Sequence, residues 1–152
     1  MISTRLVQLI ESNADQLIDR VAAEIRHEPE MTRGTSIQDH ELRGLGQDLL
    51  YHLGDWLSAG NSHNLAVRFE RFGKLCYEQE IPLHEAVRGM CLLREKMLDF
   101  AQEHMISTSS IELYAEEELE RRLGRFFDRL ATHLVRGFEE AVRKPAVRAA
   151  TH

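Results

Sequence analysis

Apolar residues recur every three or four positions along almost the whole chain, and no stretch alternates steadily between apolar and polar residues. This spacing puts apolar side chains on one face of a helix, whereas a half-buried strand would alternate with a period of two. Only 9 glycines and 3 prolines interrupt the pattern. The sequence therefore predicts an all-α protein, a helical bundle of about five helices with a long C-terminal helix.

Three helices are predicted in the first half of the chain. The first lies between Thr4 and Pro29, because apolar residues keep helical spacing up to a proline that disfavours helix before it. The second starts near Ser36 and ends at Gly60, a residue type that is typical of a helix end. The third stops before Pro82, whose fixed φ suits the first turn of the next helix.

The fourth predicted helix, from about Pro82 to His104, is apolar around much of its circumference. So broad an apolar surface indicates burial between two or more neighbouring helices, as at the centre of a bundle. The last helix is predicted to run from Ser110 to about Arg143 and to end at Pro145. Residues 1–143 are therefore expected to form a single domain, with residues 144–152 as a flexible tail.

The last predicted helix is longer than the average for a globular domain, so it either breaks near Gly124 or projects and pairs with a second copy. Its second part carries a row of large apolar residues close to a heptad repeat. These predict a homodimer interface and a helix that transmits a signal, formed by Leu123, Phe127, Leu130, Leu134 and Phe138. Alternatively, the same row covers the chain's own fourth helix.

Composition excludes several classes of function. The 152 residues hold 19 Lys plus Arg against 25 Asp plus Glu, a net charge of −6. This balance argues against nucleic-acid partners and against attachment to anionic membranes. The sequence shows no signal peptide and no apolar run of membrane-spanning length, and its two cysteines, Cys76 and Cys91, are too few for a secreted disulfide framework. We therefore expect a cytoplasmic protein.

The chain carries no local motif for catalysis or for a cofactor. It has no glycine-rich phosphate loop, no nucleophile elbow and no Cys-x-x-Cys pair. We therefore predict a protein that is not an enzyme and needs no cofactor, and that acts through a signalling partner or an output domain. A small-molecule ligand of unknown identity is expected, if it binds at all, in the bundle interior near Trp56, Met90, Met97 and Phe127.

Histidines offer two alternative functions. A haem- or metal-binding sensor would use His133, which shares its side of the last helix with apolar residues, or His84 or His104 at the ends of the fourth helix. A histidine phosphotransfer bundle would use His40, because His40-Glu41-Leu42-Arg43 repeats the start of the phosphoacceptor box of sensor histidine kinases. At each position the favoured explanation is an ordinary solvated or core-boundary histidine.

One segment resembles a known family. Residues 73–100 read GKLCYEQEIPLHEAVRGMCLLREKMLDF. The segment is similar to the RsbRD-type N-terminal sensory domain of RsbT co-antagonist proteins, associated with stressosome signalling, and to the helical region of PucR-type regulators. Gly73, the Ile81-Pro82-Leu83 turn and Arg88 carry the likeness, and residues 9–25 and 134–142 resemble the flanks of the family. The resemblance implies a helical sensory or protein-interaction module of a stress-response regulator.

The turn before the fourth helix has a physical consequence of its own. Pro82 pushes Ile81 into an extended conformation, so the third and fourth helices are predicted to reverse and pack antiparallel. The family commonly has glycine where this chain has Glu80, which would be strained by about 1 kcal/mol in a left-handed conformation or would force a different connection. Arg88 and Glu95 lie on nearly one helix face and could tie the fourth helix to a neighbour. We expect Arg88 to have a partner if it is covered, and the alternative is that its charged end extends to water.

Overall fold

The computed structural model describes residues 4–29, 39–58, 63–104 and 110–151. Over these residues the chain forms seven helices and no strand, which confirms the predicted all-α class. The helices are α1 (Thr4–Ser12), α2 (Ala14–His27), α3 (Asp39–Leu50), α4 (Leu53–Ser58), α5 (His63–Glu78), α6 (Leu83–Glu103) and α7 (Ser110–Thr151).

Two of the predicted helices are each divided into two, which accounts for the larger number. The first breaks at Asn13, whose side-chain amide donates a hydrogen bond of 2.8 Å to the carbonyl oxygen of Leu9. Asparagine favours such local bonds over a regular helix. The second predicted helix is interrupted by a turn at Tyr51 and His52, between α3 and α4. Apolar spacing continues across both breaks, so periodicity alone does not reveal them.

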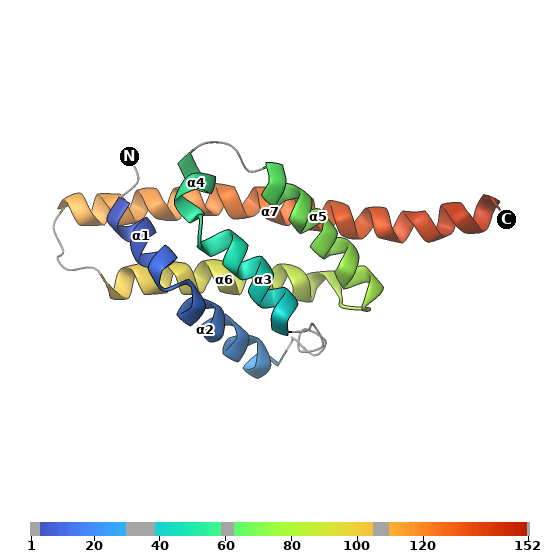
Figure 1. Cartoon of the computed structure of the whole chain (residues 1–152), viewed down its shortest axis with the longest axis horizontal. Coiled ribbons are helices and arrows are strands. Elements are labelled where there is room, and N and C mark those ends of the chain that lie inside the picture. Colours follow the sequence, from blue (N-terminus) through green and yellow to red (C-terminus); the bar gives the residue numbers. More distant parts are fainter. Residues whose placement is uncertain (1–3, 30–38, 59–62, 105–109, 152) are drawn as a thin grey trace.

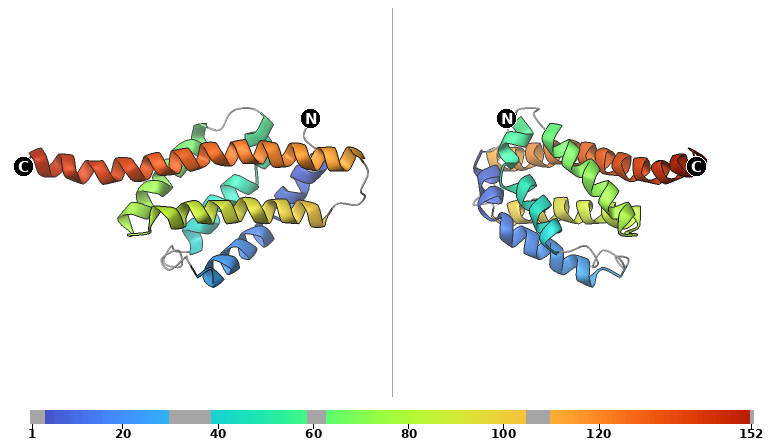
Figure 2. Two further views of the ribbon diagram at one scale, coloured as in Figure 1. Left: turned by 180° about the vertical axis from the view of Figure 1, so that it is seen from behind. Right: turned by 45° about the vertical axis from the view of Figure 1, so that its right-hand side comes forward.

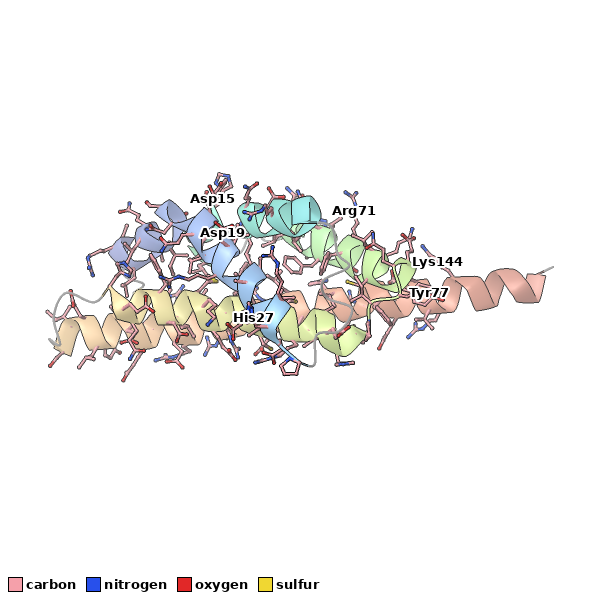
Figure 3. The ribbon with its side chains drawn as sticks, turned by 90° about the horizontal axis from the view of Figure 1, so that it is seen from below. Asp15, Asp19, His27, Arg71, Tyr77 and Lys144 are labelled. Atoms are coloured by element: carbon pink, nitrogen blue, oxygen red, sulfur yellow. The ribbon has the colours of Figure 1, made fainter. Side chains whose placement is uncertain are left out.

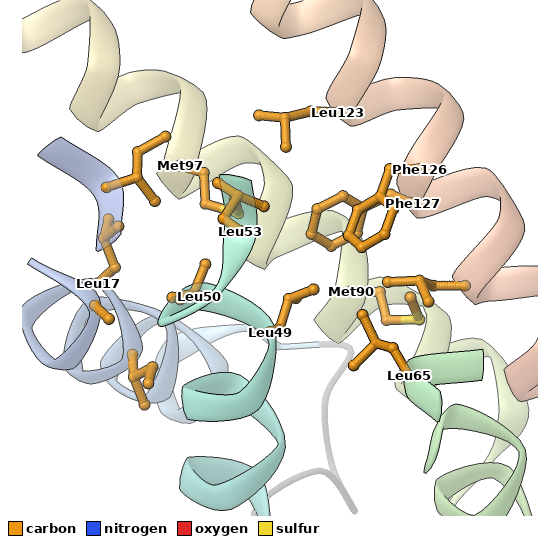
Figure 4. Packing of buried hydrophobic residues seen from close by; sticks show 14 of the residues in the cluster. Leu17, Leu49, Leu50, Leu53, Leu65, Met90, Met97, Leu123, Phe126 and Phe127 are labelled. Carbon is orange, nitrogen blue, oxygen red and sulfur yellow. The ribbon is translucent and has the colours of Figure 1, made fainter. Parts of the chain in front are cut away.

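The helices form two layers. The long helices α6 and α7 lie side by side, and α1 to α5 cover one face of this pair (Figure 1, Figure 2). The view from below shows the same arrangement, with α1, α2, α3 and α5 on one side of α6 and α7 (Figure 3). Large, almost fully buried side chains point into the space between the layers, among them Phe126, Leu49, Leu53 and Met97 (Figure 4).

Helices α5 and α7 cross at unusually close range, because a glycine stands on each of them at the crossing point. A Cβ atom added to Gly137 of α7 would lie 2.7 Å from the carbonyl carbon of Glu70 on α5 and would overlap the oxygen. A Cβ added to Gly73 of α5 would lie 2.9 Å from the backbone nitrogen of Phe138. Any larger residue at either position would force the two backbones apart.

The connection from α5 to α6 ends α5 in a Schellman motif. The N–H of Ile81 donates to the carbonyl oxygen of Cys76 at 2.8 Å, and the N–H of Glu80 donates to that of Tyr77 at 3.1 Å. Glu80 takes the left-handed conformation, with φ of 59°, so of the two outcomes left open for this position, strain or a different connection, the structure has the first. Ile81 and Cys76 are both buried, the apolar contact that accompanies this motif.

Helix α7 is longer than predicted. It continues through Gly124 without a break and through Pro145 to Thr151. Pro145 lacks an N–H and therefore removes one backbone hydrogen bond from this helix. The C-terminal part of α7 therefore projects beyond the other helices (Figure 1, Figure 2). Among the described helices, none combines the length and apolarity that crossing a membrane requires.

Candidate ligand cavity and transmission helix

An apolar cavity of about 90 Å³ lies where five helices meet. Helices α2, α3, α5, α6 and α7 all contribute described side chains to its walls. Large apolar residues dominate these walls, and they include Ile18, Ile25, Leu49, Phe69, Phe72, Met90 and Phe127. Figure 4 shows Phe127, Met90 and Leu49 converging from α7, α6 and α3.

Small residues leave this space open. Ala22 of α2 and Ala86 of α6 stand in the walls where a larger side chain would fill the cavity. Gly46 of α3 also lines the cavity, but Ile18 occupies the space beside it, since a Cβ added to Gly46 would meet Ile18 Cγ1 at 3.0 Å. The sequence signal for the cavity was therefore a set of small residues on otherwise large apolar faces, drawn from helices far apart in the chain.

Two charged residues also border the cavity, and both are already engaged. Glu85 of α6 is buried, with 1% of its surface exposed, and it has an interaction partner within the protein. Arg43 of α3 forms an ion pair with Asp19 of α2. The cavity itself therefore offers an apolar surface, and the charges around it serve to hold the helices together.

The four residues predicted to surround a ligand do not all meet in the structure. Met90 and Phe127 line the cavity. Met97 lies about 10 Å further along α6 and is fully buried in the core near Leu53 (Figure 4). Trp56 is half-buried at the edge of the core, where its indole N–H donates to the carbonyl oxygen of Asp48 at 3.0 Å.

The residues predicted to form a dimer interface are placed inside the chain's own core. Leu123, Phe127, Leu130 and Leu134 are at most 4% exposed. Phe138 is half-buried and packs edge-on against Tyr77 of α5, with ring centroids 5.7 Å apart. This row of α7 faces the chain's own α5 and α6, the alternative that the spacing left open. In Figure 3 the labels Tyr77 and Lys144 mark the region where α7 leaves the bundle.

The predicted turn residues hold the second half of the bundle together. Gly73 lies at the crossing of α5 and α7, Ile81 is buried, and Pro82 caps the N-terminus of α6 with Leu83 following it. Arg88 has the carboxylate partners that we expected, Glu28 and Glu95, each at 3.2 Å. The hydrogen bond to Glu28 is the largest cause that raises the pKa of Arg88. Through this pair α6 is tied to the residue that follows α2.

The histidines proposed for haem or metal lie apart. His84 and His104 are about 30 Å apart along α6, at roughly 1.5 Å per residue. The His104 ring packs on Phe100 with centroids 4.2 Å apart, and its Nδ1 lies 2.9 Å from the Phe100 carbonyl oxygen. His133 Nδ1 lies 3.6 Å from Glu70 Oε2 on α5. Within the described part of the chain, no three His, Cys, Asp or Glu side chains cluster as metal ligands would.

His40, the residue proposed for phosphotransfer, belongs to the backbone of α3. Its side chain lies outside the described residues, so that proposal has no structural test here.

A comparison with protein families matches residues 13–152 to the RsbT co-antagonist protein rsbRD N-terminal domain. The chain belongs to this family. The matched region of the RsbRD N-terminal domain begins at the break between α1 and α2 and includes the cavity, the α5–α6 turn and all of α7. The resemblance drawn from residues 73–100 is thereby confirmed. No curated protein and no solved structure matches the chain.

Proposed function

We propose that this RsbRD N-terminal domain is a non-catalytic sensory and interaction module of a cytoplasmic stress-response regulator, with α7 as its output element. Membership of a stress-signalling family supports the general role. The continuity of α7 carries the specific proposal, because this single helix of 42 residues lines the apolar cavity through Phe127 and also projects out of the bundle (Figure 1).

Helix α7 is suited to transmit a change because it is held firmly on one side. The backbone of α7 touches that of α5 where Gly73 and Gly137 cross. Phe127, which lies N-terminal to this crossing on α7, lines the cavity. Well-packed helices respond to a change in the core by small rigid shifts rather than by local deformation. A shift at Phe127 would therefore move the projecting end of α7.

The projecting end of α7 is the surface that we propose for partners. Val142 is 45% exposed there, so part of this apolar side chain faces solvent. The partner is an RsbT-related protein, an output domain or a second copy of the chain, which would form a homodimer. Because the predicted interface row is buried, a second copy would contact α7 beyond Phe138.

Native mass spectrometry of the full chain, alone and with an RsbT-family protein, tests this proposal. Val142→Asp should weaken self-association or partner binding while the fold is kept, because it puts a charge on the projecting surface. Ile111→Asp is the matched control, since Ile111 is the 82% exposed apolar residue at the other end of the same helix. Equal binding by both variants and the parent chain would refute the role of the projecting end. An absorbance spectrum of the same sample with a Soret band would instead support the haem sensor.

A further inference from the structure

We propose that the cavity between α2, α3, α5, α6 and α7 is a binding site for a small, uncharged apolar molecule of a few carbon atoms. Binding itself is inferred from the cavity, whereas its use as a signal rests on the sensory function proposed above.

The size of the cavity sets the size of the ligand. An engineered apolar cavity of about 150 Å³ in another protein stays free of water and binds benzene or xenon. The cavity here measures about 90 Å³. It has room for a xenon atom or a short alkyl group, and it is too small for a drug-sized or nucleotide ligand, which needs roughly 300 Å³ or more.

The chemistry of the walls sets the class of the ligand. Phenyl and aliphatic groups form nearly all of the surface, including Phe69, Phe72 and Met90. Both charged neighbours, Glu85 and Arg43, already have partners within the protein. A charged ligand would lose its hydration without gaining a hydrogen bond or counter-ion, whereas an apolar ligand would pay no such desolvation penalty and would gain contacts.

The position of the cavity connects a ligand to the output helix. Phe69 and Phe72 belong to α5 and Phe127 belongs to α7, the two helices that cross at Gly73 and Gly137. A ligand that touches all three rings would therefore change the packing of this helix pair directly. It would also contact α2 through Ala22, so it would bridge the two layers of the bundle.

Methionine methyl NMR on the full chain tests the site, with xenon as the probe. Met90 lines the cavity, and Met97 is buried on the same helix away from it, so one molecule contains both the reporter and its control. The Met90 methyl resonance should shift and saturate as xenon is added, while that of Met97 stays in place. No shift of Met90 at saturating xenon, or equal shifts of both methyl groups, would overturn the proposal.

Two further comparisons test the ligand class and the location. Butane should shift Met90 as xenon does, whereas butyrate, which adds a carboxylate to a similar chain, should not. Ala22→Leu should abolish the shift by filling the cavity, and Ala23→Leu, on the exposed face of the same helix, should leave it unchanged. Equal shifts with butyrate, or an unaltered response in folded Ala22→Leu, would contradict the proposal. Partner binding by α7 is measured in a separate experiment, so failure of xenon binding and failure of partner binding can be distinguished.

Discussion

Substitution of Gly137 by alanine tests the closest contact in the fold. The added Cβ would lie 2.7 Å from the carbonyl carbon and 2.8 Å from the Cα of Glu70, and nearer still to the carbonyl oxygen. Carbon atoms pack at about 3.5–4.0 Å, so α5 and α7 would have to separate by about 1 Å. Neither backbone can avoid the contact by a change of rotamer, because the clashing atoms belong to the main chain.

The expected loss of stability is the difference between two opposing effects. Alanine favours helix over glycine by about 1 kcal/mol at an interior position. Over-packing of a close contact costs about 1–3 kcal/mol and sometimes more, and a gap of 1 Å along α5 and α7 would loosen buried neighbours such as Phe69 and Leu134 as well. We therefore expect Gly137→Ala to lower the free energy of unfolding by up to about 2 kcal/mol.

Urea unfolding of the two variants and the parent chain gives the measurement. Gly124→Ala is the control, because Gly124 lies on the same helix and a Cβ there would meet nothing within 4 Å. That variant should gain up to about 1 kcal/mol from helix propensity alone. If Gly137→Ala is as stable as Gly124→Ala, the helices do not cross at the described distance and the reasoning is refuted.

Three other substitutions have expected outcomes. Glu80→Gly should raise the free energy of unfolding, measured in urea, by about 1 kcal/mol, because glycine adopts the left-handed conformation without the strain of a glutamate. A decrease would show that Glu80 is not strained there. Glu118 accepts a hydrogen bond from Arg122, and this bond lowers the pKa of Glu118. The stabilisation by Glu118 should therefore be present above the ordinary glutamate pKa and disappear as the pH falls through the lowered pKa. Glu118→Gln should accordingly lower the free energy of unfolding at neutral pH and have the same free energy of unfolding as the parent chain in acid. A difference between the two chains that does not change with pH would show that the ionisation of Glu118 does not stabilise the fold. Leu130→Ala should cost about 2–5 kcal/mol in thermal unfolding, since Leu130 is 2% exposed; an unchanged melting temperature would place Leu130 outside the core.

Helical periodicity was sufficient to predict the fold class and the burial of α6, because both depend on spacing within one helix. The reversal between α5 and α6 was also predictable, since Pro82 acts on the residue directly before it, whereas the conformation of Glu80 was not decided by the sequence. The break at Asn13 was not, because a side-chain hydrogen bond decides it while the apolar spacing continues unchanged. Sequence also left open which neighbour covers Leu123 and Leu134, and the structure answers with the chain's own helices.

The cavity lay beyond what one sequence can predict. Met90 and Phe127 were named because they are large and apolar in the centre of the bundle, and they do line it. Met97 is also large, apolar and central, yet it packs in another part of the core, because it lies about two helical turns along α6 from Met90 and does not reach the cavity. The small residues Ala22 and Ala86 border the empty space, and their role depends on how α2 is placed against α6.

Hydrogen exchange of the full chain, measured alone and with an RsbT-family protein, tests the role of α7 as output element most directly. Our account predicts that binding slows exchange along the projecting end of α7, from about Glu139 onward, and leaves the outer surfaces of α1 and α2 unchanged. Protection confined to α1 and α2, with no change along α7, would contradict it.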